Sequence, residues 1–349
     1  MKTPIQKFSM QMIVRPTTSR IPALDFTKGT LVLIMVFYHW LNYFIGINID
    51  YRYLRFLTPS FIFISGFLIG HIYLSKHTAV YSEVSKRLFT RGAKLLLIFI
   101  VLNVGRAILI ANLPSGVAVI DQINLKTLWT IFVVGDVPIT GYKVAAFYIL
   151  IPIAYLLVLS AGLVSLYKYF AYTFHVVCTL LLLSVVGLWL SGLRSPNVEL
   201  MTIGLMGALV GFVPVARINS FVRHPYLFSL SYLFYVVAIT VWNVPFVLLA
   251  VGVFLSVWGI YFMGLSDAAP GGMRRHIILL GKHSLFGYVA QIAILQVLSA
   301  TLRHVDARLG VIGISLMAAF ALTMAAVEGV ERVKRKSVIL DRLYKVAFA

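Results

Sequence analysis

Long apolar runs separated by short polar segments cover almost the whole chain. A run of about 20 mostly apolar residues suffices for a helix to cross the hydrocarbon core of a bilayer. We therefore expect an all-α, polytopic membrane protein of about ten spans. The spans are predicted at approximately residues 29–48, 56–75, 93–113, 143–166, 170–192, 200–216, 225–241, 243–264, 276–301 and 309–331.

The segments between these runs differ in how many basic residues they contain. If the N-terminus is cytoplasmic, most of the 30 Lys and Arg residues fall on the cytoplasmic side. This positive-inside bias predicts an even number of spans with both termini in the cytoplasm. The predicted organisation is a cytoplasmic N-terminal segment at residues 1–28, a membrane domain at residues 29–331 and a basic cytoplasmic tail at residues 332–349. The longest break, residues 114–142, is predicted to be an interfacial or re-entrant piece on the outside.

Composition agrees with this class, because 60% of the residues are hydrophobic and only 12% are charged. The net charge of +19 follows from the topology of the loops, so we expect a lipid bilayer and no nucleic acid as partner. The single cysteine, Cys178, excludes an intrachain disulfide and a cysteine metal cluster, and no metal site is predicted. Walker, GxGxxG, HExxH and GxSxG signatures are absent.

The first apolar run carries three polar residues of interest. Lys28 and His39 are eleven positions apart, which at about 100° per residue is nearly three whole turns, so the two share one face of a helix. The rise between them is about 16 Å, so a Lys at the membrane surface implies a His near the midplane. Asp25 lies on the same side if the helix begins that early. His39 is either a general base or a histidine hydrogen-bonded to a neighbouring helix.

Two later runs also contain polar residues. Arg106, with Asn103 one turn before it, either holds an anionic group or reaches up to the interface. Ser284, Tyr288 and Gln291 share a face at three- and four-residue spacing. That face either packs by interhelical hydrogen bonds or lines the same cavity as the histidine of the first run.

The second run and the segment after it allow two interpretations each. Ser65, Gly66 and Gly70 form a small-residue face, which either lets another helix approach closely or brings backbone near a thin ligand such as a pantetheine arm. Arg87 and Arg91 belong to a basic stripe before the third run. The stripe either attracts anionic lipid or forms a phosphate site for a nucleotide-bearing donor.

These residues carry a resemblance to a known family. Leu24–Gly29 (LDFTKG) with His39, followed by residues 63–68 (FISGFL), resembles the integral-membrane acyltransferase superfamily. That superfamily includes acyltransferase family 3, the glucan succinyltransferases and, more distantly, the heparan-glucosaminide acetyltransferases. Residues 86–91 (KRLFTR) and 280–285 (LGKHSL) are similar to the family's basic segment before the third span and to its late Gly-Lys-x-Ser segment.

The resemblance is strongest over residues 20–95, while the predicted layout of ten spans agrees along the whole chain. One position departs from the family pattern, which has an Arg where this chain has Lys28. The substitution keeps the positive charge but loses bidentate recognition of phosphate or carboxylate.

The resemblance implies transfer of an acetyl or succinyl group from cytoplasmic acyl-CoA to a hydroxyl or amine of a cell-envelope glycan. The setting it suggests is a bacterial cytoplasmic (inner) membrane, with acyl-CoA as donor substrate and no permanently bound cofactor. In this hypothesis His39 deprotonates the acceptor, and Asp25 orients or balances Lys28. Residues expected to bind the donor are Lys28, Arg87, Arg91, Ser65 and Gly66. Residues expected to bind the acceptor or the oxyanion are Arg106, Asn103, Ser284, Tyr288 and Gln291.

Two other functions remain open from the sequence. One is a transporter or exporter of a glycan-related or anionic small molecule, with His39, Arg106 and Tyr288 along the substrate path and no acyl transfer. The other is a sensor or assembly partner in an envelope-polysaccharide complex. In that case the packing face of Gly66 and Gly70 is required, while Lys28 and His39 are dispensable.

Overall fold

The computed structural model describes residues 20–45, 51–74, 81–111, 125–135, 147–222, 225–242, 246–265, 271–302 and 309–348 of the chain. These residues are almost entirely helical, and none of them forms a strand. The helices are α1 (Pro22–Trp40), α2 (Leu57–Leu68), α3 (Tyr81–Ala111), α4 (Leu125–Trp129), α5 (Leu150–Tyr167), α6 (Thr173–Leu190), α7 (Pro196–Gly211), α8 (Val215–Val222), α9 (Pro225–Val241), α10 (Phe246–Gly264), α11 (Gly272–Lys282), α12 (Ser284–Leu302), α13 (Leu309–Lys336) and α14 (Val338–Phe348). Short π-helical segments extend α1 (Leu41–Ile45), α2 (Ile69–Leu74) and α4 (Thr130–Val134), and Tyr51–Leu54 is a 3-10 helix.

The described residues contain six helices that are long and apolar enough to cross a membrane, by length and composition. These are Tyr81–Ile108, Leu150–Tyr167, Thr173–Leu190, Phe246–Gly264, Ser284–Leu302 and Val311–Lys336. Each overlaps a run in which a span was predicted, so the all-α class and the membrane character are confirmed. The number ten and the cytoplasmic placement of both termini stay predictions, and residues 1–19 lie outside the described residues.

The remaining predicted spans correspond to shorter or more polar helices. Leu57–Ile72, Pro196–Gly211 and Ser229–Val241 are apolar but shorter than the six long helices. Helix α1 is not among the six either. Its polar residues Asp25, Lys28 and His39 lower the mean hydropathy of the helix.

Several predicted span boundaries differ from the helix ends of the structure, and two of the differences affect candidate residues. Helix α1 begins at Pro22, before the predicted position 29, because a proline suits the first turn of a helix. Asp25 therefore lies inside the helix, as its shared face with Lys28 requires. Within the predicted span at 276–301, the apolar helix long enough to cross a membrane begins only at Ser284, because His283 has φ −111° and ψ 31° and separates α11 from α12.

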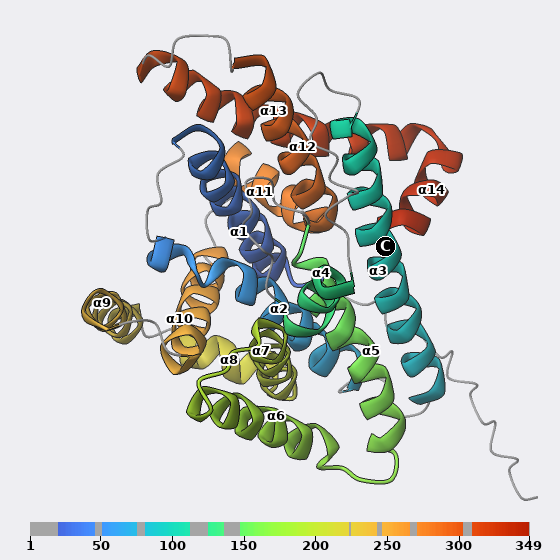
Figure 1. Cartoon of the computed structure of the whole chain (residues 1–349), viewed down its shortest axis with the longest axis vertical. Helices are drawn as coiled ribbons and strands as arrows, with labels where there is room; N and C mark the ends of the chain where they lie inside the picture. The colour runs from blue at the N-terminus through green and yellow to red at the C-terminus, as the bar shows by residue number, and fades with distance from the viewer. Residues whose placement is uncertain are drawn as a thin grey trace, which may run out of the picture.

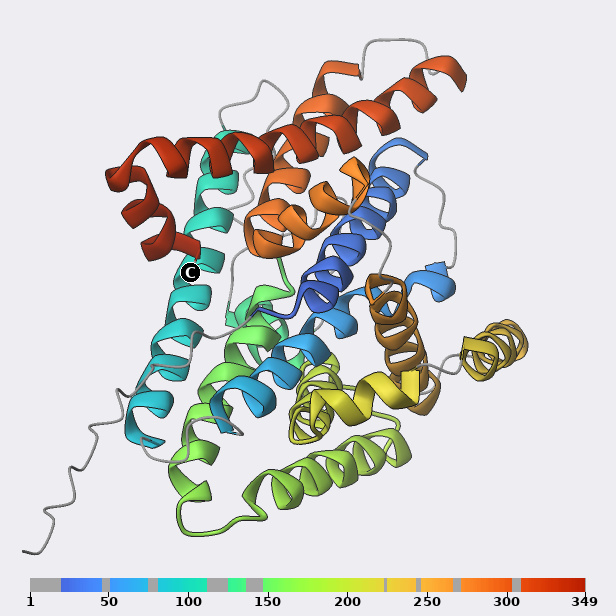
Figure 2. The same ribbon diagram turned by 180° about the vertical axis from the view of Figure 1, so that it is seen from behind.

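Helix α1 runs through the middle of the molecule (Figure 1). It contacts α2 and α10, and it also contacts α11, α12 and α13. Around this centre α3 packs along α5, α2 packs on α7, and α6 packs on α7. Helix α9 lies at the edge of the molecule beside α10 (Figures 1 and 2).

Glycines bring α2 and α7 into direct backbone contact. A Cβ at Gly66 would lie 1.8 Å from the carbonyl oxygen of Gly204, and one at Gly70 would lie 2.1 Å from that of Ala208. No side chain fits at such distances. The interpretation of Gly66 and Gly70 as a face for close helix approach is therefore confirmed.

A second glycine crossing joins α1 to α11. A Cβ at Gly29 would lie 2.0 Å from the carbonyl oxygen of Ile277, and one at Gly281 would lie 1.7 Å from that of Asp25. Because residue 25 faces 281 while residue 29 faces 277, the two helices run antiparallel at the crossing. After the break at His283 the chain reverses, and α12 runs alongside α1.

Candidate functional site

A cavity of about 190 Å³ lies where α1, α2, α3, α5 and α12 meet. Its polar lining consists of Lys28, Ser65, Ser284 and Tyr288. The rest of its wall is apolar and comes from α2, α3, the start of α5 and α12. The structure thus brings together four candidate residues from three segments that are far apart in the sequence.

One end of this cavity holds an ion pair and the first residue of a helix. Lys28 Nζ donates a hydrogen bond to Asp25 Oδ1 at 3.0 Å, and the two side chains are only 18% and 9% exposed. A lysine ammonium has three N–H donors, so others remain for a ligand in the cavity. Ser284 is the first residue of α12, and the N–H groups of a helix N-terminus add partial positive charge there. This end suits a carboxylate, a phosphate or a polarised carbonyl oxygen.

The Tyr288 ring is held in place by a strained neighbour. Phe147 packs edge-to-face on it, with ring centroids 6.1 Å apart. The φ angle of Phe147 is +59°, which is sterically costly for a bulky residue. Phe147 had not been identified from the sequence, because nothing in the local residue pattern signals a left-handed backbone at that position.

Ser65 and Gly66 are neighbours on α2 but have different surroundings. Ser65 Oγ donates to the carbonyl oxygen of Phe61 at 2.8 Å, so this serine is bonded to its own helix while lining the cavity. Gly66, next to it, faces α7 through the glycine contact described above. Of these two residues expected to bind the donor, only Ser65 lines the cavity.

The candidate base lies elsewhere on α1. His39 is half-buried, and its ring packs edge-on against Tyr38 at 5.3 Å. It is not among the residues that line the cavity. On a helix it lies about 16 Å beyond Lys28 and on nearly the same face, so the cavity and His39 occupy successive positions along one side of α1.

A second group of candidates lies on α3 and deeper along α12. Arg106 is half-buried. Asn103 Nδ2 donates to a backbone carbonyl one turn earlier, at 2.9 Å. Gln291 is fully buried, and its amide makes no hydrogen bond to any described residue.

The basic stripe of α3 is exposed and leads toward the cavity. Arg87 pairs with Glu83 at 3.5 Å, and Arg91 is also on the surface. Leu95, one turn beyond Arg91, lines the cavity. One turn corresponds to about 6 Å, so Arg91 lies close to the cavity without lining it.

A buried polar cluster surrounds the break between α11 and α12. The His283 ring is 5% exposed, with Nδ1 2.6 Å from the Tyr344 hydroxyl and Nε2 3.0 Å from Glu331 Oε2. Burial lowers the pKa of His283, although hydrogen bonding to Glu331 opposes the shift. The Lys334 ammonium lies 4.1 Å from the centre of the Tyr344 ring. This cluster joins α12, α13 and α14 next to Ser284.

A further polar cluster fixes the short segment 125–135. Asn197 Nδ2 donates to the carbonyl oxygens of Phe132 at 3.1 Å and Val133 at 3.3 Å, and its Oδ1 accepts from the Tyr148 hydroxyl. Tyr148 precedes Ile149, which lines the cavity. Asn197 had also not been identified from the sequence, where it resembles any polar residue at a helix start.

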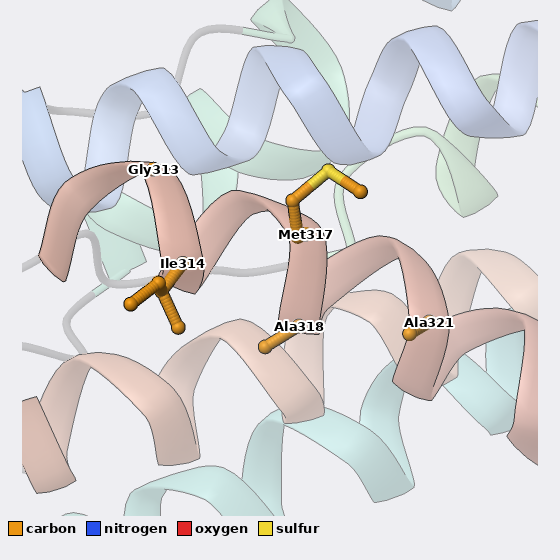
Figure 3. Close-up of a pocket in the computed structure, with 5 residues that line it drawn as sticks. All are labelled: Gly313, Ile314, Met317, Ala318 and Ala321. Atoms are coloured by element: carbon orange, nitrogen blue, oxygen red, sulfur yellow. The ribbon is translucent and has the colours of Figure 1, made fainter. Parts of the chain in front are cut away.

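A larger hollow, about 580 Å³, lies on the outer face of α13. Figure 3 shows its five lining residues along this one helix: Gly313, Ile314, Met317, Ala318 and Ala321. None of them carries a polar side chain, so the hollow offers no group for chemistry. An apolar face of this kind suits contact with lipid chains.

No group of three or more His, Cys, Asp and Glu residues in the described part of the chain is placed to hold a metal ion. Comparisons with family models, with curated proteins and with solved structures find no match for this chain. The resemblance to membrane acyltransferases therefore rests on the sequence motifs alone.

Proposed function

We propose that this protein is a membrane acyltransferase that moves an acetyl or succinyl group from cytoplasmic acyl-CoA to a hydroxyl or amine of a cell-envelope glycan. The observation that carries the proposal is the shared cavity of Lys28, Ser65, Ser284 and Tyr288. Lys28, Ser65 and Ser284 come from three separate motifs of the acyltransferase-like pattern, and their shared cavity is what supports the proposal.

The size of the cavity limits what it can hold. Pockets that enclose a drug-sized ligand measure about 300–1,000 Å³, so 190 Å³ suits part of a thin chain such as a pantetheine arm. The nucleotide of a CoA donor would remain outside, where Arg87 and Arg91 are exposed on α3. The proposed donor thus places its phosphates on the basic stripe, its pantetheine arm in the cavity and its thioester beyond the cavity, at His39 on the same side of α1.

In the proposed reaction the acceptor oxygen or nitrogen attacks the thioester carbonyl while His39 takes its proton. The C–S bond breaks, and the CoA thiolate leaves with the proton returned by the imidazolium. Negative charge on the carbonyl oxygen is stabilised by nearby N–H and O–H donors, for which Arg106 and Tyr288 are the proposed sources. Asp25 keeps Lys28 oriented at the cavity.

The test uses the purified full-length chain with acetyl-CoA or succinyl-CoA labelled in the acyl group. Release of CoA thiol and labelling of a glycan acceptor are measured together. His39→Ala is expected to lose about 100-fold or more of the rate, as for removal of a general base. His175→Ala, at an exposed histidine of α6, is the matched control and is expected to retain the rate. A folded His39→Ala variant with full activity would contradict the proposal.

One structural feature favours a second candidate function, export of an anionic small molecule. Transporters bind substrates at breaks in their helices, with helix N-termini directed at anionic groups. The break at His283 places the start of α12 and Ser284 at the cavity, beside Lys28. Movement of a labelled anionic sugar across proteoliposomes without any acyl donor would favour export, whereas thiol release without movement would favour acyl transfer.

A further inference from the structure

The C-terminal helix α14 is amphipathic and follows the spanning helix α13 after one non-helical residue, Ser337. Ser337 Oγ accepts a hydrogen bond from the Leu340 N–H at 3.4 Å, as at the start of a capped helix. Both overall views show α14 turning away from the axis of α13 (Figures 1 and 2). Its sides can therefore face different surroundings from those of α13.

The inner side of α14 is occupied by the protein. Tyr344 contacts His283 through its hydroxyl, and its ring lies against Phe286 at 6.4 Å. Phe348, one turn further, packs edge-to-face on Phe286 at 5.5 Å. These contacts fix the rotation of the helix, so its opposite side cannot turn inward.

The opposite side is an exposed apolar arc formed by Ile339, Leu343 and Val346. These side chains are 59–72% exposed, and their spacing of four and three residues puts them on one face. The inner side of α14 is fixed against the protein, so this apolar arc needs an apolar partner outside the described residues.

Basic residues flank this arc. Lys336, at the end of α13, and Arg342 are exposed, as is Lys345, which pairs with Asp341 at 2.6 Å. An apolar arc with a cationic border, directly after a spanning helix, has the charge and hydrophobicity of a helix that lies in the headgroup region of an anionic leaflet. Charge complementarity thus points to one partner.

We propose that the arc of Ile339, Leu343 and Val346 is a docking surface for anionic lipid. The apolar side chains enter the boundary between headgroups and acyl chains, and Lys336 and Arg342 contact lipid phosphates. Because the inner side of the same helix holds His283 beside the cavity, lipid contact fixes the position of the break between α11 and α12.

The test places a nitroxide label at Leu343→Cys in a Cys178→Ala background of the full-length chain. The protein is studied in lipid nanodiscs of phosphatidylcholine with or without phosphatidylglycerol, using oxygen and a nickel complex as relaxing agents for lipid and water. With phosphatidylglycerol the label is expected to be accessible to oxygen and protected from nickel. Without it, or with Lys336→Gln and Arg342→Gln together, accessibility to nickel is expected to rise several-fold.

A label at Leu183→Cys, exposed on the spanning helix α6, is the matched control and should report lipid in both kinds of disc. Three outcomes would overturn the proposal. The first is a label at position 343 that reports water with phosphatidylglycerol present. The second is an equal lipid signal in both discs. The third is protection from both agents, which would indicate a second copy or another protein segment on the arc.

Discussion

The Cα of Gly281 packs directly against the carbonyl oxygen of Asp25 where α11 crosses α1, since a Cβ on residue 281 would lie only 1.7 Å from that oxygen. Asp25 in turn accepts the hydrogen bond of Lys28. The crossing therefore places the ion pair, the break at His283 and the start of α12 next to one another. The position of the cavity depends on this contact between two backbones.

Replacing Gly281 by Ala is expected to destabilise the protein. The added methyl group meets backbone, which cannot rotate away, and overpacking costs about 1–3 kcal/mol. Thermal unfolding in detergent should show a lower midpoint. Gly259→Ala, on α10, is the control because a Cβ there meets open space, so a small gain from helix propensity is expected. Equal shifts in the two variants would argue against the close crossing.

Removing one member of the Asp25 and Lys28 pair is expected to cost more than removing both. Lys28→Met leaves a carboxylate that is mostly buried without its cation, a change that costs about 3–5 kcal/mol in comparable pairs. The double variant Asp25→Asn with Lys28→Met should recover much of that loss. The midpoints of the four proteins form a double-mutant cycle, and strictly additive losses would show that the pair contributes nothing.

Stability is expected to fall in mildly acidic solution because of His283. Burial lowers the folded-state pKa of His283 below its ordinary value of 6.5. Below pH 6.5 His283 therefore binds a proton in the unfolded chain but not in the folded chain. Protonation stabilises the unfolded chain, so the free energy of unfolding decreases as the pH falls from 6.5 toward the folded-state pKa. Unfolding midpoints measured from pH 7.5 downward should decline less in His283→Gln. If the midpoint declines equally in His283→Gln, groups other than His283 cause the loss of stability.

Asn197→Ala is expected to loosen the segment 125–135 selectively. The variant leaves the carbonyl groups of Phe132 and Val133 without their side-chain donor and removes the acceptor of Tyr148, at a cost of about 1–3 kcal/mol. Amide hydrogen exchange followed by mass spectrometry should speed up in this segment.

The control for that experiment is Asn219→Ala, which removes the acceptor of the Tyr261 hydroxyl on α10. It should leave exchange in segment 125–135 unchanged. If Asn197→Ala accelerates exchange equally in α12, the network supports the whole fold and not this segment alone.

Much of the helical framework was predictable because hydropathy and periodicity are properties of neighbouring residues. The shared face of Lys28 and His39 follows from helical geometry alone, once the chain there is helical. The close approach at Gly66 was likewise readable, because a face without side chains has little other use in a membrane helix.

The cavity could not be predicted in the same way. Ser65, Ser284 and Tyr288 meet Lys28 only because α12 reverses at His283 and runs back along α1. Residues 276–301 were predicted as one span although polar residues interrupt it around His283, and the hydrogen bonds that hold the break come from Glu331 and Tyr344.

By itself, the sequence determined that this chain forms apolar helices and that Lys28 and His39 share one face of the first of them, whereas the structure placed Asp25 in the same helix. Only the tertiary structure decided which helices cross, where α12 begins and which polar side chains share a cavity. The physical reason is that a helix is specified by contacts within a few turns. A cavity depends on backbone contacts such as that of Gly281 with Asp25, which join residues more than 200 positions apart.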